Sequence, residues 1–465
     1  HLQQNNLFSP SVEQIQDMVE KVLIENGHIG TAKAYILYRA ERTRIRNMNS
    51  RLMKTFEDIT YKDVSDSDIK RENANIDGNT AMGSMLKYGS EGAKHFYEEY
   101  VLNPVHSEAH QNGDIHIHDL DFYTLTTTCC QIDLLKLFHN GFSTGHGVVR
   151  EPNDIASYAA LACIAIQSNQ NDQHGGQAIV NLDYGLAPGV KKTYLKRYHS
   201  NMVSSIELIV NAEMAEKTKQ ALNELSQKGI YATIDENECY TQQETEALIK
   251  IGLSTEAIQK AQCFSKKKSL EETDKATYQA MESLIHNLNT MHSRAGAQTP
   301  FSSVNYGMDT STEGRMVVKN LLLVTEVGLG NGETPIFPIQ IFRVKEGINF
   351  NPGEPNYDLF RLSCRVSAKR LFPNFSFQDA PFNLQYYKGT PETEIAYMGC
   401  RTRVIGNVYD KSKEVSPGRG NLSFTTINLP RIAILSNGNI DWFYKELDRK
   451  IDIVIEQLLE RFEIQ

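Results

Sequence analysis

The sequence lacks the features of several specialised protein classes. No run of about 18 apolar residues occurs in its 465 residues, so no transmembrane helix is predicted. The opening residues do not form a secretory signal pattern, and we expect a cytoplasmic protein without a membrane partner. Basic residues are not in excess either, because 48 Lys and Arg stand against 57 Asp and Glu. At a net charge of −9 no nucleic acid polymer is expected as a partner, although helix N-termini can still hold small anions.

Cysteine is scarce as well. The seven cysteines are odd in number and scattered, apart from the adjacent pair Cys129 and Cys130. This distribution favours free thiols in a reducing cytosol over a disulfide framework. The composition is otherwise that of an ordinary globular protein. The chain is long enough for one large barrel-like domain with appendages or for two to three domains.

The N-terminal part predicts helices. Ser11 is a candidate N-cap with Gln14 completing a capping box, and Asn26-Gly27 ends this first helix. A second helix is expected from about Thr31, which gives two helices within residues 10–50. Residues 51–72 are charged and poor in large aliphatic side chains, and we expect a linker there.

The rest of the chain predicts an α/β architecture. Residues 154–170 read as a buried helix, and 202–227 and 241–295 read as largely helical. Apolar runs typical of strands follow between further helices, at 301–306, 321–327, 336–344, 403–408 and 423–429. Strands that alternate with helices favour an α/β sheet, either open or closed into a barrel.

Cys400 is a candidate reactive thiol. It follows Gly399 directly, in a polar segment rich in turn formers. A thiol at the tip of a tight loop can be projected into a cavity, which is where a reactive sulfur belongs. The alternative is a small apolar residue packed in a core, as most free cysteines are.

Two further clusters carry residues with a chemical role in many proteins. In a strand, His116, His118 and Asp114 lie on one face, where two histidines can share a metal ion. Because no third ligand is placed by the sequence, we favour hydrogen-bonded cavity histidines and predict no metal. Cys129 and Cys130 face opposite sides of an extended segment, so one can enter a cavity while the other packs elsewhere. Two buried structural cysteines are the alternative.

Two polar loops complete the set. Residues 168–177 are rich in amides, and we favour a solvated helix end over a site organised around a polar ligand. Residues 298–307 contain Ser302, Ser303 and Asn305, which suit a phosphate or a ribose. An ordinary turn that leads into a strand explains this second loop equally well.

The order and the amino-acid sequences of these segments resemble those of one family. The chain resembles an anaerobic (class III) ribonucleoside-triphosphate reductase, a glycyl radical enzyme, from about residue 73 to its last residue. Residues 10–50 resemble the last helices of an ATP-cone, the nucleotide-binding regulatory domain of this family. The resembling segments are 73–79, the strand with His116 and His118, 129–134, 172–177, 336–340, 372–375, 379–383, 398–401 and 427–431.

The resemblance implies a fold and a domain division. The fold is a ten-stranded α/β barrel with a central finger loop that holds Cys400. Residues 1–50 are expected to form the C-terminal part of an ATP-cone, 51–72 the linker, and 73–465 the catalytic barrel. The glycine radical and the zinc site of the family lie in a C-terminal domain that we expect to be absent from this chain. We therefore expect the chain alone to be inactive.

The resemblance also implies roles for single residues. Cys400 forms a transient thiyl radical and takes hydrogen from the ribose of a ribonucleoside triphosphate. Cys129 is the second active-site cysteine, with Cys130 the alternative if the strand register is shifted by one residue. Asn421, with Asn428 the second choice, resembles an amide of the members that use formate as reductant. The expected substrate contacts are His116, His118, Ser302, Ser303 and Asn305.

Partners and rival functions follow from the same resemblance. A radical SAM enzyme generates the glycyl radical, ATP or dATP and deoxynucleoside triphosphates act as effectors, and the enzyme is a homodimer or a larger homo-oligomer. The rivals are a pyruvate formate-lyase-like acyltransferase and an inactive nucleotide-binding regulator. In the acyltransferase the adjacent cysteines themselves react, whereas here the Cys129–Cys130 pair is far from Cys400 in the sequence.

Overall fold

The computed structural model describes residues 11–48, 50–62, 80–139, 141–145, 147–292 and 298–465. The chain divides into two compact units, residues 1–102 and 103–465, and each is described by itself. The motif at 73–79 lies outside the described residues.

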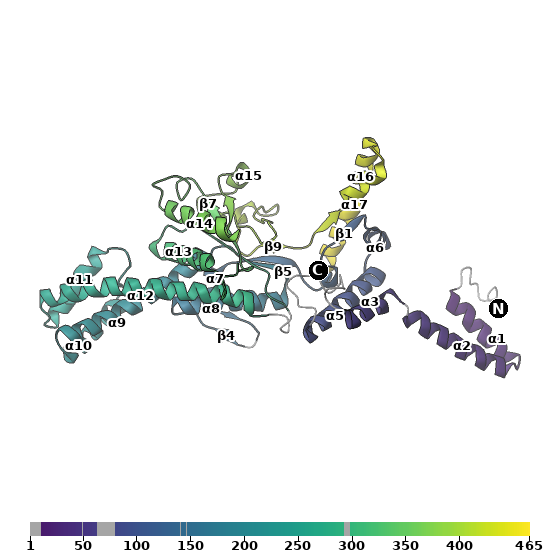
Figure 1. Ribbon diagram of the computed structural model, residues 1–465, viewed down its shortest axis with the longest axis horizontal. Coiled ribbons are helices and arrows are strands. Elements are labelled where there is room, and N and C mark those ends of the chain that lie inside the picture. The colour runs from purple at the N-terminus through teal and green to yellow at the C-terminus, as the bar shows by residue number, and fades with distance from the viewer. Residues whose placement is uncertain (1–10, 49, 63–79, 140, 146, 293–297) are drawn as a thin grey trace. The chain divides into compact units, whose positions relative to one another are not determined.

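The first unit is helical (Figure 1). Ser11 caps its first helix and forms the expected capping box with Gln14, which confirms that prediction. A helix also forms within the segment expected to be a linker, and Phe56 on it packs edge-on against Tyr88 at 5.1 Å between ring centroids. The elements are α1 (Val12–Glu25), α2 (Ile29–Met48), α3 (Arg51–Tyr61), α5 (Ala81–Phe96) and a π-helical turn (Tyr97–Val101).

The second unit is built on a six-stranded sheet. Its order is β8-β7-β6-β5-β2-β9, with the first five strands parallel and β9 antiparallel to β2. The strands are β2 (Thr128–Ile132), β5 (His174–Ile179), β6 (Ser302–Tyr306), β7 (Ile339–Val344), β8 (Asn374–Phe377) and β9 (Gly420–Asn421).

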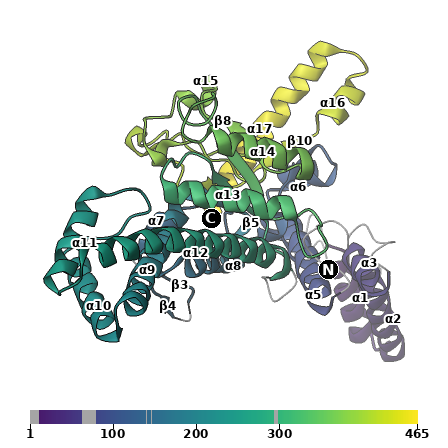
Figure 2. The same cartoon turned by 60° about the vertical axis from the view of Figure 1, so that its left-hand side comes forward.

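Helices cover one face of this sheet. Alternate strand residues, among them Ile179, Val304 and Phe342, join the main apolar core, because successive side chains of a strand point to opposite faces. In both views, α10 and α11 lie at one end of the long α9–α12 pair (Figures 1 and 2). The helices are α8 (Ile155–Asp172), α9 (Leu182–Ile209), α10 (Ala212–Gln227), α11 (Glu238–Lys250), α12 (Thr255–Thr290), α13 (Thr312–Val327) and α14 (Tyr357–Arg370).

A second, smaller sheet holds the histidine strand. It pairs β1 (Ile115–Ile117) antiparallel with β10 (Thr425–Ile427), and α6 (Pro104–Gln111), α16 (Leu429–Ser436) and α17 (Ile440–Ile464) accompany it. The short elements are a 3-10 turn (Leu120–Phe122), α7 (Leu134–His139), the pair β3 (Phe142–Ser143) and β4 (Val148–Val149), α15 (Pro381–Leu384), and 3-10 turns at Pro391–Thr393 and Lys411–Lys413.

These observations confirm the α/β fold and correct some of its details. The run at 321–327 is the end of helix α13, so the strand expected there is wrong. Residues 403–408 form no strand in the described structure and contribute one bridge, Tyr397 with Arg403. The described residues form a six-stranded sheet and two separate two-stranded ones, and the ten-stranded barrel implied by the resemblance stays a prediction.

Candidate active site

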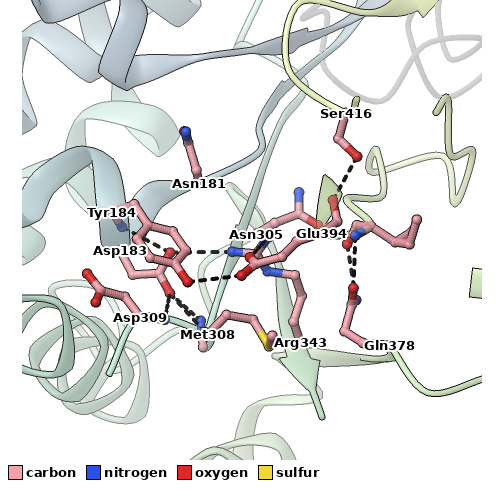
Figure 3. A network of polar contacts seen from close by, with 12 residues as sticks. Asn181, Asp183, Tyr184, Asn305, Met308, Asp309, Arg343, Gln378, Glu394 and Ser416 are labelled. Carbon is pink, nitrogen blue, oxygen red and sulfur yellow. Dashed lines mark hydrogen bonds and ion pairs between the residues drawn. The ribbon is translucent and has the colours of Figure 1, made fainter. Parts of the chain in front are cut away.

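A loop crosses the face of the sheet opposite the helices, and side-chain amides hold its backbone. Asn305 on β6 bonds both the N–H and the C=O of Tyr397, each at 2.9 Å. Gln378 does the same for Ile395 at 2.8 and 3.1 Å, and Gln131 on β2 donates to the C=O of Ala396 at 3.1 Å. Asn305 and Gln378 are seen from close by in Figure 3. Side chains from β2, from β6 and from the residue after β8 therefore hold the backbone of residues 395–397.

A buried network of charged side chains holds the same loop at Glu394, the residue before Ile395 (Figure 3). The Glu394 carboxylate lies 2.7 Å from the guanidinium of Arg343 on β7 and accepts a 2.9 Å hydrogen bond from Tyr184. Arg343 also contacts Asp183 at 3.4 Å, and Asp183 accepts the backbone N–H groups of residues 307–309 at 2.7 to 3.1 Å. Arg343, Asp183 and Glu394 are 1%, 0% and 3% exposed, so this network is sealed from water.

The network carries more carboxyl groups than cations. Burial raises the pKa of Glu394 to about 7 despite the attraction of Arg343, and raises the pKa of Asp309 to about 6 with the help of the Asp183 charge. One guanidinium cannot neutralise three buried carboxylates, and an uncompensated buried charge is costly. The network therefore binds protons near neutral pH.

Cys400 sits at the tip of this loop. The turn closes with hydrogen bonds of 2.8 Å from the Met398 N–H to the Thr402 C=O and from the Arg401 N–H to the Met398 C=O. Arg401 adopts a left-handed φ of 71°, which is costly for a residue other than glycine. Gly399 has no room for a side chain, because a Cβ there would lie 2.9 Å from the ring of Phe301.

Cys129 reaches the same place from β2. The pairing of β2 with both neighbouring strands shifts between Thr128 and Cys130, and Cys129 in this bulge has a φ of 51°. A bulge re-aims the side chain at its centre. The Cys129 sulfur accepts the N–H of Gly176 at 3.1 Å, and the residue packs with Ala178 and Met398 at 6% exposure.

The two cysteines meet, because Cys129 packs against Met398, two residues before Cys400. The interaction between the two thiols lowers the pKa of Cys400, against the opposing effect of burial, and raises the pKa of Cys129. Cys129 is thus the thiol that holds its proton more tightly, and Cys400, the more exposed of the two, donates to the Thr402 hydroxyl at 3.3 Å. The structure brings together the two cysteines that the sequence places 271 residues apart.

Cys130 lies on the other face of the strand. Its S–H donates to Gln177 at 3.0 Å, and Asn169 on α8 donates to its sulfur at 3.0 Å. Asn421 lines an open pocket of about 380 Å³ together with Cys130 and Asn169, and neither Cys129 nor Cys400 is among the residues that line it. Gln173, which lines the same pocket, bonds Thr127 at 2.7 Å. Two amides of the segment 168–177, those of Asn169 and Gln173, thus line this pocket, whereas Asn171 is exposed, and the expected solvated helix end stays a prediction.

A polar chain leads away from Cys129, and sequence reasoning missed its members as functional candidates. The Thr128 hydroxyl lies 3.8 Å from the Cys129 sulfur and donates to Asp119 at 3.2 Å. The other oxygen of Asp119 lies 2.6 Å from Nε2 of His174. Burial raises the pKa of Asp119, but hydrogen bonds from His174 and Thr128 lower it further, so it stays below its ordinary value. The sequence signals that could have pointed to these residues were the adjacent Cys129 and Cys130 and the amide-rich loop 168–177.

The other expected site residues lie elsewhere or are already engaged. His118, the residue after β1, is bonded to Thr426 at 2.7 Å and packs edge-on against His116 on β1, at 4.6 Å between ring centroids. Asn428 caps α16 by accepting the Arg431 N–H at 3.1 Å. Ser302 and Ser303 are fully buried, and their hydroxyls have no hydrogen-bond partner among the described residues.

Comparison with known proteins places this arrangement in a family. The family profile described as anaerobic ribonucleoside-triphosphate reductase matches residues 72–465. The chain belongs to this family. A profile of the ATP cone domain matches residues 1–44, which confirms the expected ATP-cone segment.

Several reductases resemble the chain over most of its length. It is 29% identical to the anaerobic ribonucleoside-triphosphate reductase of Haemophilus influenzae over 97% of this chain and 55% of that protein. The reductase of Escherichia coli is 27% identical over 97% of this chain and 54% of its own length. The reductase of enterobacteria phage T4 is 28% identical over 88% of this chain and 58% of its own length. The chain thus spans little more than half of these reductases.

Solved structures agree on the fold. The anaerobic ribonucleotide reductase of Thermotoga maritima with glycerol in the active site superposes with a TM-score of 0.54 at 12% identity, over 89% of this chain and 57% of that one. The same enzyme in complex with dATP and CTP superposes with a TM-score of 0.52 at 11% identity, over 92% and 61% of the two chains. Among the described residues, no helix combines the length and the apolarity needed to cross a membrane.

Proposed function

We propose that this chain supplies the substrate site and the two reacting sulfurs of an anaerobic reductase that converts ribonucleoside triphosphates to 2′-deoxyribonucleoside triphosphates. The observation that carries the proposal is the meeting of Cys129 and Cys400: Cys129 packs against Met398 of the Cys400 loop, whose backbone the amides of Asn305 and Gln378 hold. Membership of the reductase family favours this reaction over acyl transfer. An apolar neighbourhood of Met398 and Ala178 shields the Cys129 sulfur from water.

Cys400 has the role of a hydrogen-atom relay. As a thiyl radical its sulfur takes the hydrogen from C3′ of the ribose, so that an S–H bond forms as the C3′–H bond breaks. The unpaired electron comes from a glycyl radical that a radical SAM enzyme generates in a part of the protein outside these residues. Cys400 is exposed at the loop tip, which fits access by such a segment.

Cys129 has the role of proton donor. With the C3′ radical in place, the 2′-hydroxyl leaves as water after it takes the proton of the Cys129 thiol, whose pKa is raised by the neighbouring Cys400 and by burial. Formate then supplies two electrons and becomes carbon dioxide, so that nucleotide, formate and one proton give deoxynucleotide, carbon dioxide and water. Asn421 holds the formate through its amide, because it pairs with Thr128 beside Cys129, whereas Asn428 caps a helix. Cys130 is the weaker choice because it faces α8.

Nucleotides occupy three kinds of site in this proposal. Of the expected substrate contacts, Ser303 is the best placed, because its buried hydroxyl is unpaired and it lies on the same face of β6 as Asn305. Asn305 itself is fully used in holding Tyr397. ATP or dATP acts at the ATP-cone, deoxynucleoside triphosphates act at a homodimer interface, and the enzyme works in the cytoplasm. The family's zinc site belongs, like the glycine radical, to residues outside this chain.

The test is turnover by the complete protein after anaerobic activation. With carbon-labelled formate as sole reductant, each deoxynucleotide formed should be matched by one labelled carbon dioxide. Turnover with thioredoxin alone would remove formate from the scheme. Acyl transfer without any nucleotide reduction would overturn the proposed function itself.

A further inference from the structure

Cys129 needs a route by which a lost proton can be replaced. The residue is only 6% exposed, so bulk water does not reach its sulfur freely. Among its described hydrogen-bond partners, Gly176 offers a backbone amide, whose proton is not available for rapid transfer, and Cys400 is the radical-bearing thiol. The remaining partner is the hydroxyl of Thr128.

The Thr128 hydroxyl opens onto a continuous polar path. It lies 3.8 Å from the Cys129 sulfur and donates to Asp119 Oδ2 at 3.2 Å, while Asp119 Oδ1 lies 2.6 Å from Nε2 of His174. The side chains of His174 and Asp119 are 15% and 24% exposed. The path therefore begins at a buried sulfur and ends at groups that water can reach.

The backbone is shaped to bring these groups together. Asp119 and Cys129 both have a φ of 51°, a left-handed conformation that is unfavourable for a non-glycine residue and occurs often at functional sites. Gly175, at a φ of 84°, leaves open the space beside Thr128 and Cys129. A Cβ there would lie 2.6 Å from Thr128 Oγ1 and 2.9 Å from the Cys129 sulfur. A glycine at position 175 therefore leaves room for the Thr128 hydroxyl and the Cys129 sulfur to lie next to each other.

We propose that Thr128, Asp119 and His174 form a proton relay that returns a proton to Cys129 after each reduction. The inference rests on the proposed function, in which Cys129 gives its proton to the leaving hydroxyl. The step is a proton transfer alone: the Cys129 thiolate takes the hydroxyl proton of Thr128, Thr128 takes a proton through Asp119, and Asp119 takes the Nε2 proton of His174 as the other ring nitrogen receives one from water.

The charges around Asp119 keep it suited to this task. Arg461 on α17 faces it with a positive charge, His174 on β5 and Thr128 on β2 form hydrogen bonds with it, and His118, the residue after β1, also lies near it. These contacts hold the carboxylate ionised, so it can receive a proton only briefly and passes it on. Thr128 and Asp119 act through Cys129 and are positioning residues for the reaction.

The relay can be tested without turnover. In the infrared spectrum of the protein, the S–H band of Cys129, assigned by its loss in Cys129→Ala, should convert rapidly to the S–D band after dilution into heavy water. Thr128→Val removes the hydroxyl at nearly constant volume, and Thr128→Ser keeps it. We expect exchange to slow by on the order of 10²-fold in Thr128→Val and to stay near the wild-type rate in Thr128→Ser, as for a proton transfer that loses its positioned partner.

Asp119→Asn provides a second variant that retains the shape of the site. It should slow the same exchange while leaving the circular dichroism spectrum unchanged. Wild-type exchange rates in both Thr128→Val and Asp119→Asn would overturn the relay, whether or not the protein proves to be a reductase.

Turnover of the complete, activated protein separates the relay from the proposed function. Thr128→Val should lower kcat by about 10²-fold with the nucleotide KM retained, and should increase the solvent deuterium isotope effect, whereas Thr128→Ser restores both. An unchanged kcat in Thr128→Val would overturn the relay and leave the reductase assignment intact. Absence of turnover in the wild type, with the exchange effect present, would overturn only the reductase assignment.

Discussion

Replacing Arg343 by methionine should destabilise the protein strongly, because its guanidinium is the cation between two buried carboxylates. Arg343 is 1% exposed, lies 2.7 Å from Glu394 and 3.4 Å from Asp183, and methionine fills much of the same volume without charge. Breaking a buried ion pair by removing one partner costs about 3–5 kcal/mol. Asp183 keeps its three backbone N–H donors, so most of this cost falls on Glu394.

The cost should depend on pH in a defined direction. With Arg343 present, the pKa of Glu394 is already raised to about 7, and without it the carboxyl takes up a proton still more readily. At pH 5 Glu394 is protonated in both proteins, so the destabilisation should shrink. Urea unfolding followed by circular dichroism at pH 5 and pH 8 measures both values.

Arg365 is a matched control for this experiment. It forms an ion pair with Glu326 at 2.8 Å, but its side chain is 60% exposed. Exposed pairs contribute about 0–1 kcal/mol, so Arg365→Met should change the unfolding free energy little at either pH. A cost of Arg343→Met no greater than that of Arg365→Met, or one that is the same at pH 5 and pH 8, would refute the role given to the buried network.

Two further predictions concern the loop and its network. Gly399→Ala should destabilise the protein by about 1–3 kcal/mol and lower turnover of the complete enzyme, because the new Cβ would lie 2.9 Å from Phe301. Gly330→Ala is the control, because a Cβ at Gly330 has no other atom within 4 Å. Equal unfolding midpoints for the two variants would contradict the tight fit at Gly399. Wild-type stability should fall as pH rises from about 4 to 7, because the carboxyls of Glu394 and Asp309 have raised pKa values of about 7 and about 6 and bind protons more tightly when folded. For Glu394, a rise from 4.5 to about 7 corresponds to about 3 kcal/mol; unfolding free energies that stay level or increase across this range would contradict it.

The periodic parts of the fold could be predicted from the sequence. The helix at Ile155–Asp172 and the strands at Ser302–Tyr306 and Ile339–Val344 lie where apolar patterns indicated them. The error at 321–327 has a physical reason, because a short apolar run fits a buried helix as well as a buried strand. There Ser311 caps a helix that continues through the run to Val327, and its burial against α12 and α9 decides the outcome.

The site could be predicted only in part. Cys400 and Cys129 stand in motifs that resemble a family, and the sequence pointed to both. The bulge that turns Cys129 toward Cys400, and the face of the sheet on which Cys130 falls, depend on the pairing of β2 with two other strands. Arg343 and Glu394 carry no local signal, because their roles arise only when the loop crosses β7.

The most direct test of the account is the fate of hydrogen at C3′ of the ribose. The complete, activated protein should be given a ribonucleoside triphosphate with tritium at C3′, and tritium released to water should be counted beside the deoxynucleotide formed. If Cys400 takes this hydrogen and Cys129 acts afterwards, Cys400→Ser should give neither product, whereas Cys129→Ala should release tritium without forming deoxynucleotide. Release of tritium by Cys400→Ser at a rate near that of the wild type would contradict the assignment of Cys400 as the hydrogen-abstracting residue.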